Sequence, residues 1–334
     1  DVARIRLDVL GLLLAGATIT WAAAAAASSG GSSLAFSVLV LASAGALIAG
    51  RIVAAARRLL VPTIIVGGAF ILSVSTPDVL SAAPLSGPFG YANAKGAFFV
   101  QAAIAGLILA TGSRAAPVRL LGVAATIAFA AVPFVVRSLT PAALILLLPA
   151  AAGIASAVAG PKAAITGCAI VFIATLLLTI GLGSAYEVGS RSGPVDRVVD
   201  STLTERRIAL WHEALVIMSD HPIAGVGIGG FKLFSPTARS DRDARWTHNS
   251  FLQQGAETGL VGLILLILIF LWGFASLSAT AGQAFTHVLA AVALAALAIH
   301  ACVDYVLHFP AVPLTTAALV GAATANHPRP ARDT

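Results

Sequence analysis

Residues 260–277 read LVGLILLILIFLWGFASL, a run of eighteen residues without a charged side chain. A helix needs about 20 mostly apolar residues to cross a hydrocarbon core ~30 Å thick, so this run predicts a membrane-spanning helix. The whole chain has the same character, since 58% of its 334 residues are hydrophobic and only 10% are charged. Soluble domains carry about 25% charged residues, so the composition excludes a soluble globular protein and also a disordered one.

Ten apolar runs have about the length of a spanning helix. They cover residues 9–27, 33–50, 59–76, 96–112, 119–136, 141–160, 163–184, 254–277, 286–304 and 309–325. The runs are continuously apolar rather than alternating, which indicates helices and not a β-barrel. We therefore expect an all-α integral membrane protein with about ten transmembrane helices. Because residue 1 is Asp, we also expect the native chain to begin further upstream.

The basic residues of the short loops predict how the helices are oriented. With the first helix entering from the inner side, ten basic residues fall on that side, and only Lys95 and Arg137 fall on the outer side. Lysine and arginine collect on the cytoplasmic side of membrane proteins, so both visible ends are predicted to lie inside. The net charge of +6 therefore reflects membrane orientation and not nucleic-acid binding.

The other eight basic residues lie in residues 185–248, together with eight acidic residues. This orientation places that segment outside, and a loop of such length is usually functional or disordered. Its aromatic and glycine residues favour order. We predict an N-terminal bundle of about seven helices (residues 1–184), a large extracytoplasmic catalytic loop (185–253) and about three C-terminal transmembrane helices (254–334).

The large loop is predicted to contain an amphipathic helix. Residues 202–205 read TLTE, which is typical of a capping box, and His221-Pro222 ends the pattern. One stripe of this helix is apolar and consists of Ile208, Trp211, Leu215 and Met218. We expect the helix to lie along the membrane surface with this stripe facing down, or to cap the helix bundle.

Two short patterns in the loop resemble cofactor or metal motifs. Residues 225–230 read GVGIGG, which matches G-x-G-x-x-G, but no strand precedes it. We therefore predict a turn that brings the backbone close to a lipid, a helix or a substrate, and not a dinucleotide site. Residues 241–243 read DRD, as in metal-dependent glycosyltransferases, but neighbouring arginines oppose a cation. His212-Glu213 lacks the second histidine of a zinc protease, so we expect no metal.

Arginines and a few ionisable residues near the helix ends are the candidate functional groups. Five arginines of the loop could bind phosphate through their guanidinium forks, or could reach lipid headgroups: Arg206, Arg207, Arg239, Arg242 and Arg245. His248 lies at the predicted outer boundary, and an imidazole, with an ordinary pKa of about 6.5, can exchange protons near neutral pH. Glu257 is a candidate because ionisable residues inside membrane segments are costly. His300 and Asp304, spaced i and i+4, are predicted to form a structural pair.

Taken in order, these segments resemble the O-antigen ligase and polymerase superfamily of bacterial membrane glycosyltransferases. The matching block reads RIALWHEA at 207–214, HPIAGVGIG at 221–229, HNSFLQ at 248–253 and ETGLVG at 257–262. Weaker matches are SGPFGYANA at 86–94 and DYVLHFP at 304–310. Many members carry a Ser-Arg-Gly triplet before the large loop, where this chain has Arg137-Ser138-Leu139, so a role for Arg137 rests on a displaced arginine.

The resemblance implies an activity and an architecture. Such proteins transfer a glycan from an undecaprenyl-diphosphate carrier to an acceptor sugar or lipid on the outer face of the bacterial plasma (inner) membrane. The implied fold is that of lipid-donor glycosyltransferases (GT-C-like), with an amphipathic loop helix over the catalytic cavity. The resemblance implies neither a nucleotide cofactor nor a metal.

The expected chemistry assigns roles to individual residues. His248 is the predicted base for the acceptor hydroxyl, and Arg207 the main cation for the leaving diphosphate. The expected further contacts to diphosphate or glycan are Arg206, Arg242, Arg245, Asn249, Trp211, Asn93, Glu257 and Arg137. Attack opposite the diphosphate would invert the anomeric carbon.

Three alternatives stay open at this stage. A polysaccharide polymerase of the same superfamily would share donor and motifs and differ in its acceptor. A transporter or flippase for a lipid-linked glycan would place polar groups near the bilayer midplane, often in broken helices of paired repeats. A catalytically inactive scaffold would not need His248.

Overall fold

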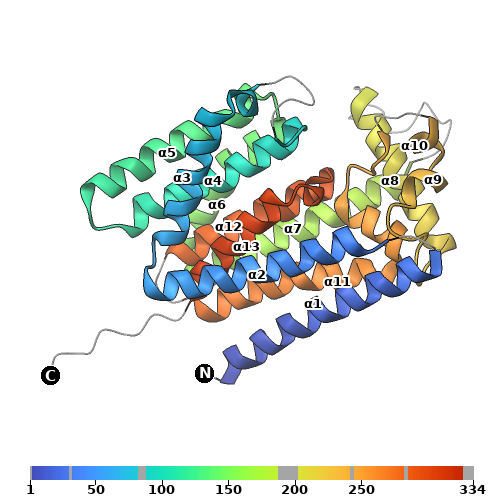
Figure 1. Cartoon of the computed structure of the whole chain (residues 1–334), viewed down its shortest axis with the longest axis horizontal. Coiled ribbons are helices and arrows are strands. Elements are labelled where there is room, and N and C mark those ends of the chain that lie inside the picture. Colours follow the sequence, from blue (N-terminus) through green and yellow to red (C-terminus); the bar gives the residue numbers. More distant parts are fainter. Residues whose placement is uncertain are drawn as a thin grey trace. The chain divides into compact units, whose positions relative to one another are not determined.

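The computed structural model describes residues 2–29, 32–81, 88–186, 202–240, 244–281 and 285–325, with the side chains of 202–204 left out. Regular structure within these ranges is helical throughout (Figure 1). The helices are α1 (Val2–Ser29), α2 (Leu34–Ala56), α3 (Leu60–Ser75), α4 (Ala92–Gly112), α5 (Ala116–Val135), α6 (Leu139–Ala159), α7 (Pro161–Ser184), α8 (Thr202–Asp220), α9 (Phe231–Phe234), α10 (Pro236–Ser240), α11 (Ser250–Thr280), α12 (Phe285–Val303) and α13 (Ala311–Ala323), with 3₁₀ turns η1 (Pro77–Leu80) and η3 (Val306–His308).

Each of the ten predicted apolar runs forms a helix. Eight of these helices in the described part of the chain are long and apolar enough to cross a membrane, namely α1, α2, α4, α5, α6, α7, α11 and α12. The other two, α3 and α13, are apolar but shorter, at 16 and 13 residues. The chain is therefore an all-α multi-pass membrane protein, with eight candidate spans and two shorter apolar helices.

The helices group into two compact units. Unit 1 consists of Asp1–Leu41, Ala169–Trp272 and Ala298–His308, and unit 2 consists of Ala42–Cys168, Gly273–Leu297 and Phe309–Thr334. Unit 1 holds α8, α9, α10 and most of α11, and unit 2 holds α3 to α6. Both units assemble segments that are far apart in the chain.

In unit 2, small residues allow α4 and α5 to pack closely. A Cβ on Gly122 would overlap the backbone of Ala110, and a Cβ on Gly106 would reach the backbone of Thr126. The hydroxyl of Thr126 donates a hydrogen bond across the interface to the carbonyl of Ala103 at 3.3 Å. Close packing at small residues is a common way for membrane helices to associate.

The start of α4 differs from the prediction. The helix begins at Ala92 and not near residue 96, so Lys95 lies in its first turn instead of in a loop. The side chain of Lys95 is fully buried. Its ammonium group donates hydrogen bonds to the carbonyls of Ser81 at 2.9 Å and Asp78 at 3.3 Å. Hydrogen bonds of this kind offset the cost of burying a charge, which explains how a lysine fits here.

In unit 1, the core between α7 and α11 is aromatic. Phe172 of α7 lies 5.2 Å from Phe251 and 5.6 Å from Phe270, measured between ring centroids. These three rings are buried. Aromatic pairs at such distances contribute about 0.5–1.5 kcal/mol beyond the area they bury, so this cluster fixes α11 against α7.

Helix α11 is broken at Gly259, which has φ 71° and ψ −176°. The break divides it into residues 250–258 and residues 260–280. The break frees backbone groups of α11, and other segments of unit 1 form hydrogen bonds with them. Three carbonyls before the break accept hydrogen bonds: Ala256 from Val226 N–H (2.9 Å), Glu257 from Gly227 N–H (2.8 Å) and Thr258 from the indole N–H of Trp21 (2.8 Å). After the break, the N–H of Leu260 donates to the carbonyl of Pro222 at 2.8 Å. At these four groups the break is therefore supported by the chain's own donors and acceptors.

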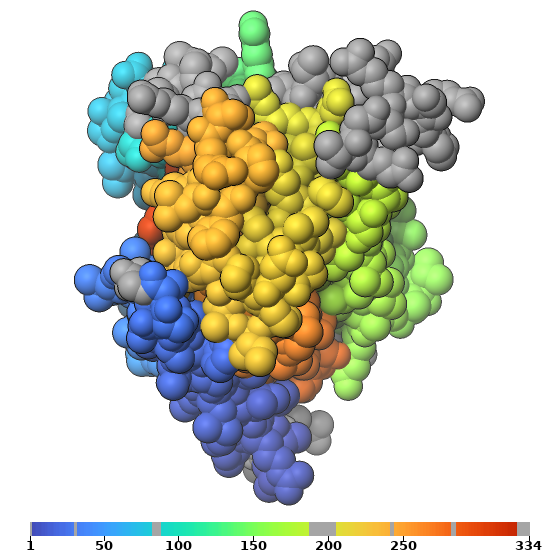
Figure 2. Space-filling model, turned by 90° about the vertical axis from the view of Figure 1, so that its right-hand side faces the viewer, coloured from blue at the N-terminus to red at the C-terminus, as the bar shows by residue number. Residues whose placement is uncertain are grey.

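The glycine-rich segment is the turn that fills this break. Gly225, Gly227 and Gly229 all have positive φ values, a conformation that glycine adopts without a steric penalty. A Cβ on Gly225 would overlap the backbone of Glu257, and one on Gly227 would overlap Ser29 at the end of α1. The prediction of a turn that approaches a helix closely is confirmed. Figure 2 shows this face of unit 1, with α8, α9 and α10 in yellow to gold.

Helix α8 confirms the predicted amphipathic helix and its bounds. Its buried side chains are Ile208, Leu210, Trp211, Ala214 and Ile217. They pack against buried side chains from the part of the chain that follows α8. These side chains are Val226, Phe231, Ala238, Ala244, Leu252 and Ala256. The predicted stripe is correct for its first two residues, but Leu215 and Met218 are only partly buried, because α8 turns a wider face toward this core. The predicted side-chain cap lies outside the described residues.

Candidate active site

Two non-glycine residues in the described ranges have left-handed backbone conformations, His248 with φ 50° and Arg137 with φ 56°. Such a conformation costs roughly 1–2 kcal/mol for a residue with a Cβ. It persists only where the surroundings enforce it, and it is frequent at functional sites. Both residues were candidate site residues from the sequence.

The backbone of His248 is held by hydrogen bonds on both sides. Asn249, which is fully buried, caps α11, since its Oδ1 accepts hydrogen bonds from the N–H groups of Phe251 and Leu252 at 3.0 Å. Its Nδ2 donates to Thr179 of α7 at 3.1 Å. The indole of Trp211 donates to the carbonyl of His248 at 3.3 Å. Asn249 and Trp211 thus fix the position of His248.

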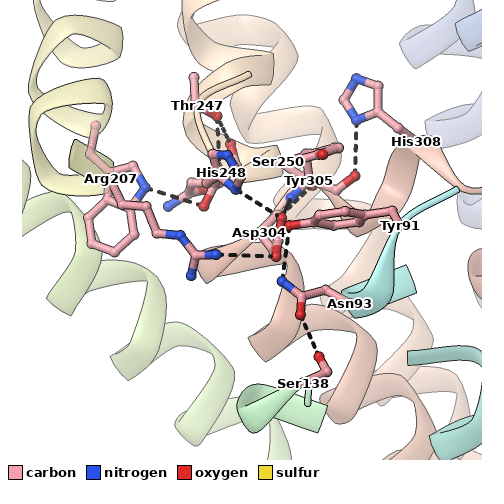
Figure 3. Close-up of polar contacts among 12 residues, drawn as sticks. Tyr91, Asn93, Ser138, Arg207, Thr247, His248, Ser250, Asp304, Tyr305 and His308 are labelled. Carbon is pink, nitrogen blue, oxygen red and sulfur yellow. Dashed lines mark hydrogen bonds and ion pairs between the residues drawn. The ribbon is translucent and has the colours of Figure 1, made fainter. Parts of the chain in front are cut away.

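The side chain of His248 contacts Asp304, which follows α12 directly. The two atoms in contact are Nδ1 of His248 and Oδ1 of Asp304, 3.3 Å apart. The other carboxylate oxygen, Oδ2, lies 3.7 Å from Nη2 of Arg207 (Figure 3). The Asp304 side chain is only 1% exposed, compared with 16% for His248 and 30% for Arg207. One buried carboxylate therefore connects a half-buried histidine and a half-buried arginine.

These contacts keep Asp304 ionised. Burial disfavours the charged form, but the hydrogen bond from His248 and the positive charges around the carboxylate outweigh burial. The pKa of Asp304 consequently lies well below the ordinary value of an aspartate.

The backbone around Asp304 joins the end of α12 to the beginning of α11. Its carbonyl accepts hydrogen bonds from Ser250, at 3.3 Å from the backbone N–H and 3.0 Å from the hydroxyl. Its Oδ1 also accepts a hydrogen bond from the N–H of Tyr305 at 2.8 Å. Two segments 56 residues apart in the chain are thereby held together at the site.

The remaining candidates of unit 1 are three arginines and the buried Glu257. Arg206 on α8 and Arg245 before α11 are exposed, and Arg242 lies outside the described residues. Glu257 is only 6% exposed. Its carboxylate accepts hydrogen bonds from the backbone N–H groups of Gly229 and Phe231 and, at 3.1 Å, from the side-chain amide of Gln253. Its carboxylate therefore ties the glycine-rich turn to α11.

The candidates of unit 2 are neighbours within that unit. The hydroxyl of Ser138, which follows the strained Arg137, donates to Oδ1 of Asn93 at 2.5 Å. The Nδ2 of Asn93 donates to the hydroxyl of Tyr91 at 3.0 Å. Arg137 itself is exposed, in the turn between α5 and α6. Asn93 is thus fixed in orientation beside a turn that presents an arginine.

Asp304 was missing from the sequence-based set of site residues. The spacing predicted a pair with His300, which does interact with Asp304, and the carboxylate also contacts His248 and Arg207. The Nε2 atom of His300 is buried without a hydrogen-bond partner. The sequence signals that pointed to Asp304 were its i, i+4 spacing from His300 and the resemblance of residues 304–310 to a family segment.

The arrangement can carry out a proton transfer next to a cation. A carboxylate bound to Nδ1 of a histidine fixes the tautomer and leaves Nε2 to accept a proton. A guanidinium beside it can stabilise an oxyanion or a phosphate. Together these groups suit a displacement in which a hydroxyl is deprotonated and an anionic group leaves.

The comparisons with known proteins agree with the sequence resemblance. Residues 97–267 match the family described as O-antigen ligase, and this match covers more than half of the chain. It includes Arg207, Trp211, His248 and Asn249, and ends before Asp304. A search of curated proteins found no match. The chain therefore belongs to the O-antigen ligase family, a family of ligases and polymerases that process glycans at membranes.

Proposed function

We propose that this protein moves a glycan from an undecaprenyl-diphosphate carrier to an acceptor sugar or lipid, with His248 as the base and Arg207 as the main ligand of the diphosphate. Membership of the O-antigen ligase family supports membrane glycan processing of this general kind. The observation that carries the specific proposal is the contact of one buried carboxylate, Asp304, with both His248 and Arg207.

His248 is the base in this proposal. The ionised carboxylate of Asp304 keeps the proton of the neutral imidazole on Nδ1, so that Nε2 carries the free electron pair. A base with this orientation can accept the proton of an acceptor hydroxyl within hydrogen-bond reach, which contributes typically 10²–10⁴-fold to a rate. The strained backbone of His248 supports a functional role, because its position is held by Trp211 and Asn249 at an energetic cost.

The proposed reaction is a single displacement. The acceptor oxygen attacks the anomeric carbon of the donor while its proton passes to Nε2 of His248. The bond between the anomeric carbon and the diphosphate oxygen breaks, and its electron pair stays on that oxygen. The products are the glycosylated acceptor, with an inverted anomeric centre, and undecaprenyl diphosphate; His248 then releases its proton to water.

Arg207 stabilises the leaving group. A guanidinium carries five N–H donors, so the ion pair with Asp304 leaves donors for diphosphate oxygens. We assign supporting charge to Arg206, Arg242 and Arg245, which makes a metal ion unnecessary in this proposal. In this proposal three residues position other groups instead of binding the substrate: Trp211 and Asn249 hold His248 in place, and Glu257 holds the glycine-rich turn. Asn93 and Arg137 are proposed substrate contacts on the basis of the sequence.

We further propose that residues 185–253 form the extracytoplasmic catalytic loop of a GT-C-like enzyme in the bacterial plasma membrane, between helical parts 1–184 and 254–334. The support is the distribution of basic residues in the short loops, which favours the opposite side of the membrane for both ends of the chain.

Two alternatives can be separated from this proposal. A polymerase would perform the same chemistry on a second lipid-linked glycan as acceptor. A transporter often contains broken helices, and α11 is one, but its freed backbone groups are hydrogen-bonded to the chain's own segments and not available to an ion or substrate. The enzyme is therefore the favoured function.

The test uses the full chain in lipid nanodiscs with an undecaprenyl-diphosphate oligosaccharide and a panel of acceptors. Release of undecaprenyl diphosphate is measured for the wild type, His248→Gln and Arg207→Ala, with and without a chelator. His221→Gln and Lys232→Ala are the matched controls, because both residues are exposed on the same segment of unit 1.

We expect release that survives the chelator and falls at least 100-fold in His248→Gln and Arg207→Ala, with both controls near wild type. Productive transfer to a second lipid-linked glycan would identify a polymerase. Wild-type rates in His248→Gln, or a retained anomeric configuration in the product, would refute the proposed displacement.

A further inference from the structure

Next to His248 lies a group of aromatic rings that the proposed chemistry does not use. We define the aromatic cluster as Trp246, Tyr305 and His308. The ring of Trp246 lies 6.1 Å from Tyr305 in a stacked arrangement and 4.5 Å from His308. The ring of Tyr305 lies 4.9 Å from that of His248, nearly perpendicular to it. The cluster is therefore in direct contact with the proposed base.

The aromatic cluster differs from the aromatic core of the same unit. Phe172, Phe251 and Phe270 are between 0 and 6% exposed and serve to pack α7 against α11. Trp246 and Tyr305 are only half-buried, and His308 is exposed. Rings that pack a core bury their faces, whereas these three keep part of their surface accessible. Partly exposed aromatic rings gathered beside a proposed base are a candidate binding surface.

The cluster is also fixed in position before any ligand arrives. The N–H of Tyr305 donates to the carboxylate of Asp304 at 2.8 Å, and Val306 behind it is fully buried. The backbone N–H of His308 donates to the carbonyl of Tyr305 at 3.0 Å, and its Nδ1 lies 3.2 Å from the same oxygen. Figure 3 shows Arg207 and His308 on opposite sides of Asp304. A surface fixed in this way loses little conformational entropy on binding.

We infer that the aromatic cluster is the subsite for the acceptor, and that it holds a pyranose ring with its C–H face against Trp246 and Tyr305. This inference rests on the proposed function, because the base must lie within reach of the hydroxyl that it deprotonates. Only the acceptor carries that hydroxyl, so the ring beside His248 belongs to the acceptor. The diphosphate of the donor then binds Arg207, on the other side of the Asp304 carboxylate from the aromatic cluster (Figure 3).

The chemistry of a sugar ring suits this surface. A pyranose with mostly equatorial hydroxyls presents apolar C–H groups on its faces and polar groups at its rim. The face of an aromatic ring is electron-rich and apolar, so it accepts such a C–H face and removes apolar surface from water. A phosphate or a carboxylate would be repelled by the same face.

The first experiment measures binding without any donor. The full chain in nanodiscs is irradiated at its aromatic protons, and saturation transfer to methyl β-D-glucopyranoside, methyl β-D-galactopyranoside and the open-chain polyol glucitol is recorded by NMR. We expect transfer to the ring C–H protons of a glycoside and little to glucitol. Trp246→Leu and Tyr305→Leu should reduce the transfer at least threefold, whereas Trp246→Phe should retain it. Phe234→Leu, an exposed aromatic on α9, is the matched control.

The second experiment measures transfer with the undecaprenyl-diphosphate donor and a glycoside acceptor. Trp246→Leu and Tyr305→Leu should raise the acceptor KM about tenfold, equivalent to about 1.4 kcal/mol of binding free energy. The KM for the donor should change less than twofold. Equal changes in both KM values would indicate a structural role and overturn the inference.

The two proposals can fail separately. Binding that depends on Trp246 and Tyr305, together with wild-type donor release in His248→Gln, would refute the proposed reaction and leave a sugar site. Loss of transfer in His248→Gln, together with no saturation transfer to either glycoside, would refute the acceptor subsite alone. A signal from farnesol that the two leucine variants abolish would assign the cluster to the lipid and also refute it.

Discussion

Replacing Asp304 by asparagine tests the site at its centre, because asparagine keeps the shape of the side chain and removes its charge. In the wild type the carboxylate contacts Nδ1 of His248 at 3.3 Å, Nη2 of Arg207 at 3.7 Å and the N–H of Tyr305 at 2.8 Å. An amide has one acceptor oxygen and one NH₂ group, and Oδ1 of Asp304 faces both His248 and Tyr305. If the NH₂ group takes the place of Oδ1, it donates to Nδ1 of His248, which stabilises the wrong tautomer with the proton on Nε2, and Tyr305 loses its acceptor. If the oxygen takes that place, the NH₂ group faces Arg207, and the negative charge that orients the imidazole is lost.

The expected decrease in the transfer rate follows from the loss of general base catalysis by His248. General base catalysis contributes about 10²–10⁴ to a rate, equivalent to about 3–5 kcal/mol of activation free energy. We expect the transfer rate of Asp304→Asn to fall by this range. The charge-assisted hydrogen bonds that it loses contribute about 1.5–3 kcal/mol to folding, so the variant should be destabilised yet still fold.

The assay is single-turnover release of undecaprenyl diphosphate in nanodiscs, for Asp304→Asn, His248→Gln and the double variant. Asp220→Asn, at the exposed end of α8, is the control for loss of a carboxylate. If Asp304 acts through His248, the double variant should be no slower than His248→Gln alone. Losses that multiply in the double variant would refute this reasoning, because the two residues would then act independently.

Four further predictions concern charge, backbone and pH. Arg207→Lys should lose at least tenfold in donor release, because an ammonium cannot reproduce the planar guanidinium fork; equal rates would show that only the charge matters. Gly259→Ala should lower the thermal unfolding midpoint strongly because of its positive φ, whereas Gly181→Ala, whose Cβ meets open space, should not. Because the folded pKa of Asp304 is depressed, its contribution to stability is present above about pH 4 and is lost as the pH falls further, so the unfolding midpoint should decrease more steeply below about pH 4 in the wild type than in Asp304→Asn. Glu257→Gln should increase proteolysis of the glycine-rich turn, since the amide replaces one of the two oxygens that accept hydrogen bonds from this turn; an unchanged cleavage rate would contradict this role.

The membrane helices were predictable because length and hydropathy are local properties of the sequence. All ten apolar runs became helices, and α8 has the bounds that its end signals indicated. The boundaries were less accurate where polar residues belong to a helix. Helix α11 begins at Ser250, four residues before the apolar run, because Asn249 caps it.

The candidate site was only partly predictable, since its key contact is not local. Helical spacing predicted that Asp304 pairs with His300, and the two groups do interact, but α12 ends at Val303. The carboxylate also contacts His248, 56 residues earlier in the chain. The periodicity of a helix predicts only contacts within that helix, and it cannot predict a contact between residues so far apart in the chain. The role of Glu257 was hidden for the same reason, since its partners are backbone groups of a turn.

The break at Gly259 has a consequence for depth in the bilayer. Residues 260–280 rise by about 31 Å at 1.5 Å per residue, which is enough to cross a hydrocarbon core ~30 Å thick. The nine residues before the break are therefore not needed for crossing, and they carry Gln253, Gln254 and Glu257. A charged group at the centre of a bilayer costs about 2.5–3.5 kcal/mol on insertion scales, a cost avoided in the headgroup layer. The glycine thus divides one continuous helix into a segment that is long enough to cross a bilayer by itself and a polar segment that is buried within unit 1 and begins two residues after His248.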